Sequence, residues 1–151
     1  MRNATYYYIN FVSAILLFLF IYTALSKLSD FSLFRATLSS QPTIGKNADW
    51  VAWFIIVPEL MAAMLLFIPK YRTIGLVFSL FLLSVFTAYI VYMLVRFQHL
   101  PCSCGGVISK MSWMQHMFFN IALVLLAAAA IYLKKLNKLF IAINRRSRIP
   151  V

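Results

Sequence analysis

Charged residues are scarce in this sequence, and acidic residues are almost absent. Only 11% of the 151 residues are charged and only three are Asp or Glu, whereas 64% are hydrophobic. The mean hydropathy is +0.89. A soluble domain of this size carries about a quarter charged residues. The composition therefore excludes a soluble globular domain and indicates an integral membrane protein.

Cysteine is equally rare. Cys102 and Cys104 are the only two, and they lie one residue apart in the segment PCSCGG at 101–106. A structural bridge across so short a loop would remove little entropy from the unfolded chain, whereas a strained disulfide is easily reduced. A zinc site takes four ligands, and only His99 and His116 are available to join the two thiolates. The spacing favours thiol redox chemistry, with metal binding and a non-catalytic pair as the alternatives.

Four apolar stretches are each long enough to cross a hydrocarbon core, which takes about 20 helical residues. They cover residues 6–26, 50–68, 74–95 and 113–133. The runs are continuous rather than alternating, which favours helices over a barrel. The first run is longer than the apolar region of a secretory signal, about 7–15 residues, so we expect a retained helix. We predict a single all-α domain, a four-transmembrane-helix antiparallel bundle, with a short amphipathic surface helix at about 30–39.

The basic residues predict the orientation of the bundle in the membrane. One side holds both termini and the second connection, with nine lysines and arginines, most of them in the tail 134–151; the other side holds five. We therefore expect cytoplasmic termini at a bacterial inner membrane, and the Cys102/Cys104 connection in the oxidising periplasm. The net charge is +11, and we interpret the basic tail that contributes to it as a topology anchor that contacts membrane lipids. No nucleic-acid motif accompanies it, so no nucleic-acid partner is expected.

Two basic residues are expected near the cysteine pair. His116 falls in the first turns of the fourth span, and Lys110 precedes that span. An imidazolium, an ammonium group or a helix N-terminus close to a thiol favours its thiolate form. The alternative for His116 is an interfacial histidine packed beside Trp113. Asn120, one turn deeper on the same helix face, is typical of a hydrogen bond between helices.

Glu59 is the acidic residue that falls inside a predicted span, next to Pro58 and near the middle of the membrane. Ionisable residues at that depth are rare and mark functional sites. In a structural role, Glu59 would bond to the backbone carbonyl that Pro58 leaves free, or to a Ser or Thr of the third span. In a functional role, it would carry protons or contact a bound ligand such as a quinone.

Three segments together resemble a known family: ALSKLSDF at 24–31, VPEL at 57–60 and PCSCGG at 101–106. Their order and spacing are similar to the MauE branch of the DoxX-like four-helix membrane proteins, over almost the whole chain. The resemblance implies an association with the methylamine-utilisation machinery, where the family helps a periplasmic disulfide-rich subunit to mature. The resemblance also implies a similarity to the four-helix core of vitamin K epoxide reductase-like and disulfide-forming enzymes. Those enzymes use a C-x-x-C pair beside a quinone and a second cysteine pair.

The leading hypothesis is an inner-membrane thiol–disulfide redox protein. Cys102 and Cys104 would exchange electrons with a periplasmic thioredoxin-like or other cysteine-containing protein, and a quinone near Glu59 is the candidate acceptor. Because this chain has C-x-C and no second pair, a partner must supply the shuttle cysteines. The alternative is a non-enzymatic subunit or assembly factor of a larger membrane complex. A transporter centred on Glu59 has weaker support, since the sequence shows no internal repeat.

Overall fold

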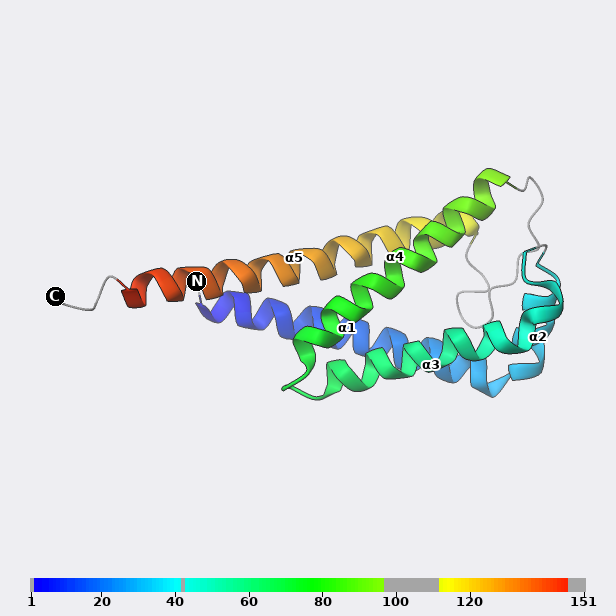
Figure 1. Ribbon diagram of the computed structural model, residues 1–151, viewed down its shortest axis with the longest axis horizontal. Helices are drawn as coiled ribbons and strands as arrows, with labels where there is room; N and C mark the ends of the chain where they lie inside the picture. The colour runs from blue at the N-terminus through cyan, green and yellow to red at the C-terminus, as the bar shows by residue number, and fades with distance from the viewer. Residues whose placement is uncertain (1, 42, 97–111, 147–151) are drawn as a thin grey trace.

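Four long helices and one short helix make up the described part of the protein, a computed structural model that covers residues 2–41, 43–96 and 112–146. The long helices are α1 (Arg2–Ser29), α3 (Ala48–Phe67), α4 (Arg72–Arg96) and α5 (Trp113–Arg146). The short helix α2 (Phe31–Ser39) and a 3₁₀ turn, η1 (Gly45–Asn47), connect α1 to α3 (Figure 1). Within these ranges there is no strand, and the predicted all-α bundle with a surface helix is confirmed.

All four long helices are long and apolar enough to cross a membrane. The candidate spans are Ala4–Ser29, Gly45–Phe67, Arg72–Arg96 and Met114–Ile143. Their outward faces carry large apolar side chains: Phe18 is 71% exposed, Phe54 79% and Leu125 64%. Water would penalise such surfaces, whereas lipid chains cover them without cost. The chain is therefore a multi-pass membrane protein.

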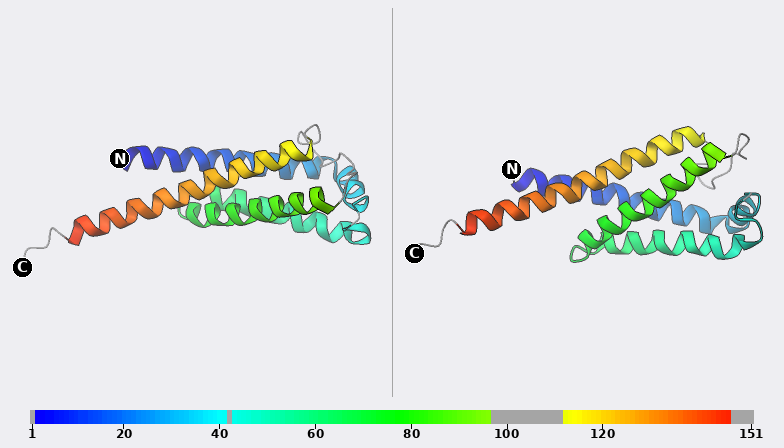
Figure 2. Two further views of the ribbon diagram at one scale, coloured as in Figure 1. Left: turned by 90° about the horizontal axis from the view of Figure 1, so that it is seen from above. Right: turned by 45° about the horizontal axis from the view of Figure 1, so that its top comes forward.

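The four spans form a ring in which every neighbouring pair is antiparallel. Helices α1 and α4 each pack against both α3 and α5 (Figure 2). Small residues allow the close approach that helix association in membranes requires. On α5, Ala127 and Ala130 are fully buried at helical spacing. On α4, Gly75 lies so near α3 that an added Cβ would be 2.8 Å from the backbone nitrogen of Leu66.

Polar contacts link the helices at the end of the bundle that carries the α3–α4 turn. Arg72 at the start of α4 donates to the Asn10 amide oxygen of α1 at 2.5 Å, and Lys134 of α5 donates to Thr73 of α4. Beyond Lys134, α5 continues as a helix to Arg146. Much of the predicted basic tail is thus helical, and Figure 2 shows it projecting past the other helices.

Helix α2 covers the opposite end of the bundle. Its first turn is capped by Asp30, whose carboxylate accepts from the Leu33 backbone N–H at 3.3 Å. Phe34 and Leu38, one turn apart on its inner face, are buried against the first turns of α3. The chain then turns at Gly45, whose φ of +48° favours glycine. The first connection is thereby folded onto the bundle rather than extended away from it.

Candidate functional site

A buried ion pair joins α1 to α3 inside the apolar bundle. The Lys27 ammonium donates to both carboxylate oxygens of Glu59, at 2.7 and 2.9 Å, and contacts the Thr23 backbone carbonyl at 3.4 Å. The two side chains are 13% and 4% exposed. Both residues lie within candidate membrane spans. The structure therefore holds a matched pair of charges in a region where single charges are costly.

This partner differs from those expected for Glu59. Neither the carbonyl left free by Pro58 nor a hydroxyl of the third span bonds the carboxylate. Lys27 does, although it lies just beyond the predicted first span, 6–26. The physical reason is that α1 stays helical as far as Ser29. Lys27 therefore falls one turn after Thr23, on the face of α1 that packs on α3.

Helix α2 encloses the ion pair from the outer end of the bundle. The Lys27 nitrogen lies 5.8 Å from the centroid of the Phe34 ring, within the range of a cation–π contact. Phe34 is 5% exposed and is held there by packing on α3. The surface helix thus covers the pair at this end of the bundle, and reduced contact with water strengthens the attraction between its charges.

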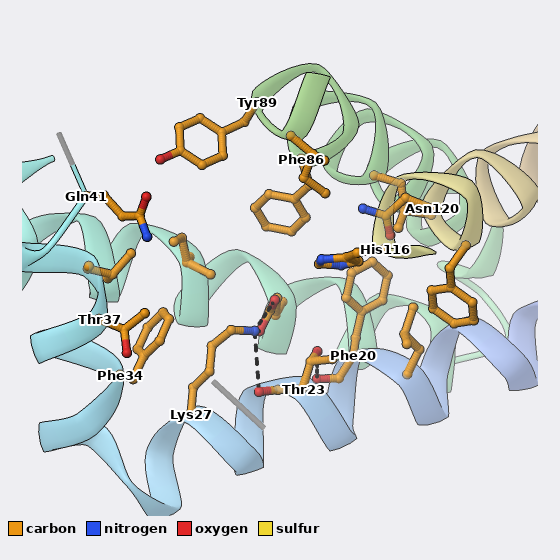
Figure 3. A pocket seen from close by; sticks show the side chains of 17 residues that line it. Phe20, Thr23, Lys27, Phe34, Thr37, Gln41, Phe86, Tyr89, His116 and Asn120 are labelled. Carbon is orange, nitrogen blue, oxygen red and sulfur yellow. Dashed lines mark hydrogen bonds and ion pairs between the residues drawn. The ribbon is translucent and has the colours of Figure 1, made fainter. Parts of the chain in front are cut away.

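The ion pair lines a cavity of about 150 Å³ to which all five helices contribute (Figure 3). Most of the lining is aliphatic or aromatic. The polar or charged side chains among it are Thr23, Lys27, Thr37, Gln41, Glu59, Tyr89, His116 and Asn120. An apolar cavity with a few converging polar groups is typical of a small-molecule site.

Three polar side chains of the cavity stand out by their surroundings. Gln41 and Asn120 are each 4% exposed, and His116 is half-buried. The side-chain oxygen of Gln41 has no hydrogen-bond partner within the described ranges. Gln41 approaches from the α2 side, whereas His116 and Asn120 approach from α5 on the other side (Figure 3). The cavity therefore presents hydrogen-bonding groups on two opposite walls.

A family model described as Methylamine utilisation protein MauE matches residues 5–133. The chain belongs to the MauE family. The match begins in the first turn of α1 and ends at residue 133, within the candidate membrane span of α5. No curated protein and no solved structure matches the chain. The wider relation to DoxX-like proteins stays a prediction.

The structure brings together two of the five predicted site residues of this MauE-family chain. Glu59 and His116 both line the cavity, and Asn120 lies beside His116 on the same helix face. Cys102, Cys104 and Lys110 lie outside the described residues. Their predicted roles stay predictions.

Sequence reasoning missed Lys27, Thr23, Tyr89 and Gln41 as parts of the site. A signal existed for Lys27, since a lysine four residues after Thr23 at the end of an apolar run continues the same helix face. No comparable signal existed for Gln41. It follows α2 in a connection, and its burial depends on how that connection folds back onto the bundle.

Proposed function

We propose that this MauE-family protein is an inner-membrane thiol–disulfide redox protein that oxidises a cysteine pair on a periplasmic partner. In the exchange, the Cys102–Cys104 disulfide breaks and the partner's disulfide forms. Two electrons pass from the partner to this chain, and the two protons released by the partner's thiols are balanced by those taken up by Cys102 and Cys104. The partner class is a thioredoxin-like or other cysteine-containing protein that matures through this step.

The observation that supports the proposal is the position of the two helix ends between which the PCSCGG segment lies in the sequence. Helix α4 ends at Arg96 and α5 begins at Trp113, so the connection that carries the PCSCGG segment is attached between them. The last turns of α4 and the first turns of α5 line the cavity, through Tyr89 and His116 among others. The ends of α4 and α5 that the cysteine connection joins in the sequence thus also line the cavity.

The charge distribution supports the orientation that the proposal needs. Lys70, Arg72, Lys134, Lys135 and Lys138 gather at the α3–α4 end and along the adjoining part of α5. All three acidic residues lie in the half that carries α2. Since lysine and arginine are enriched on the cytoplasmic side, we propose that the α3–α4 turn and both termini are cytoplasmic. The cysteine connection is then periplasmic, where disulfides persist.

The test uses the full chain, purified in lipid nanodiscs and oxidised, with a reduced thioredoxin-like protein as the dithiol probe. Free thiols are counted by mass tagging after acid quenching. We expect one probe dithiol to be oxidised per chain. We expect no oxidation by C102S/C104S, and normal oxidation by the matched control Ser103→Ala, which changes the residue between the cysteines. In cells, the single variants Cys102→Ser and Cys104→Ser should trap a mixed disulfide that identifies the partner.

Two results would contradict the proposal. One is oxidation of the probe by C102S/C104S at the wild-type rate. The other is a co-purifying membrane partner whose stability depends on this chain but is unchanged in C102S/C104S. The second result would favour a non-enzymatic assembly factor instead.

A further inference from the structure

The cavity at the Lys27–Glu59 pair has the features of a built ligand site. Its walls carry the rings of Phe20, Phe34, Phe86 and Phe119. Polar side chains interrupt this apolar lining at separate places, as Figure 3 shows. Flat aromatic walls with polar groups at the ends suit a flat ring with polar substituents.

Gln41 supplies the first indication that a ligand completes the site. Its side chain is 4% exposed, and its Oε1 atom has no hydrogen-bond partner among residues 2–41, 43–96 and 112–146. A buried polar atom without a partner is destabilising, and native structures rarely tolerate one. Because Gln41 lines the cavity, a ligand there that carries a hydrogen-bond donor, such as a hydroxyl group, is in a position to satisfy this acceptor.

His116 and Asn120 supply a second polar group on the opposite wall. Within the described ranges, no hydrogen bond is recorded for the Asn120 amide or the His116 ring, and Asn120 is 4% exposed. A carboxamide offers both a donor and an acceptor, and so does a neutral imidazole. Each wall can therefore meet either a carbonyl oxygen or a hydroxyl group.

The ion pair at the base of the cavity argues against a charged ligand. The three N–H groups of the Lys27 ammonium have three acceptors, namely the two oxygens of Glu59 and the Thr23 carbonyl. The pair has no net charge and no free donor on lysine. Among the described residues that line the cavity, no cation is left unpaired to bind a phosphate or carboxylate head group.

We propose that the cavity binds the ring of a membrane quinone, with one ring oxygen at Gln41 and the other at His116 and Asn120. A quinol hydroxyl donates to Gln41 Oε1, which has no partner among the described residues, whereas a quinone carbonyl accepts from the Gln41 amide NH₂ and leaves Oε1 unsatisfied. On the opposite wall, Asn120 and His116 can donate to a carbonyl or accept from a hydroxyl. A fatty acid or a sterol has a polar group at one end only and leaves the other wall unsatisfied.

This inference rests on the proposed function for the role of the ligand. A bound quinone supplies an acceptor for two electrons and two protons. The electrons come from the Cys102 and Cys104 dithiol, whose two S–H bonds break as the S–S bond re-forms. The oxidised pair is then restored for the next partner.

The experiment measures binding without any thiol chemistry. The full chain in nanodiscs is labelled with a photoreactive azidoquinone, and the labelled peptides are mapped by mass spectrometry. We expect labelling of peptides from α2 and the first turns of α5. Decylubiquinone and decylubiquinol should both displace the probe, and palmitate should not. Because each lost hydrogen bond weakens binding by about a factor of ten at most, Gln41→Leu and Asn120→Leu should each lower decylubiquinone affinity by about that factor.

Asn137→Leu is the matched control, since Asn137 lies on α5 but does not line the cavity. It should leave the affinity unchanged, as should C102S/C104S. Labelling confined to lipid-facing residues would overturn the inference, and so would displacement by palmitate or wild-type affinity in both cavity variants. If the chain does not bind decylubiquinone but still oxidises the reduced thioredoxin-like protein, the quinone site alone is overturned. Intact binding without thiol exchange would support the quinone site and overturn the proposed function.

Discussion

Breaking the buried ion pair should destabilise the protein far more than breaking an exposed one. In Lys27→Met, Glu59 loses the ammonium that lies 2.7 and 2.9 Å from its two oxygens in the wild type. The Glu59 side chain is only 4% exposed, so it is left poorly solvated when this partner is removed. Removing one member of a buried pair costs about 3–5 kcal/mol. We expect a loss of that size in the free energy of unfolding.

The Arg35–Asp49 pair provides the matched control. Its side chains are 56% and 54% exposed, and exposed pairs contribute about 0–1 kcal/mol. Arg35→Met should therefore cost less than about 1 kcal/mol. The double variant K27M/E59L should be more stable than Lys27→Met, because it leaves no unpaired charge.

Unfolding free energies come from SDS titration in mixed micelles, followed by tryptophan fluorescence. The reasoning is refuted if Lys27→Met costs no more than Arg35→Met, or if K27M/E59L is less stable than Lys27→Met.

Two further predictions concern the fold around the site. Gly75→Ala should lower the free energy of unfolding by about 1–3 kcal/mol, since the added Cβ would lie 2.8 Å from the Leu66 backbone. Ala88, on the exposed side of α4, provides the control. An equal loss in Ala88→Val would contradict the prediction. Asp30→Ala should cost about 1 kcal/mol through loss of the α2 cap, and faster proteolysis of the α1–α3 connection is the readout. Unchanged stability and proteolysis would show that the cap does not hold α2.

The fold was predictable from the sequence because hydrocarbon imposes a simple requirement. A span must be long, apolar and internally hydrogen-bonded, and each of these properties appears directly in the residue order. The surface helix was predictable for a related reason. Phe34 and Leu38 recur at helical spacing after Asp30, a residue type that favours helix starts. The extension of α5 to Arg146 was not anticipated, since it lies beyond the length that a membrane requires.

The site was predictable only in part, because periodicity gives the face of a helix but not its partner. Glu59 was identifiable as a buried carboxylate, whereas its pairing with Lys27 depends on how α1 and α3 are aligned. His116 was placed at the correct end of the fourth span, and the structure adds that it lines a cavity. Gln41 is polar, lies in a connection and shows no pattern, so only the tertiary structure reveals its burial.

The accessibility of Cys102 and Cys104 tests the central claim most directly. Spheroplasts that express the full chain are treated with a membrane-impermeant maleimide, before and after a membrane-impermeant phosphine reductant, and the labels are located by mass spectrometry. The account predicts that both cysteines are labelled from outside once the phosphine has reduced the pair. It also predicts that a fraction is protected as a disulfide beforehand. Cysteines that are fully reduced, and labelled only after the membrane is permeabilised, would contradict it.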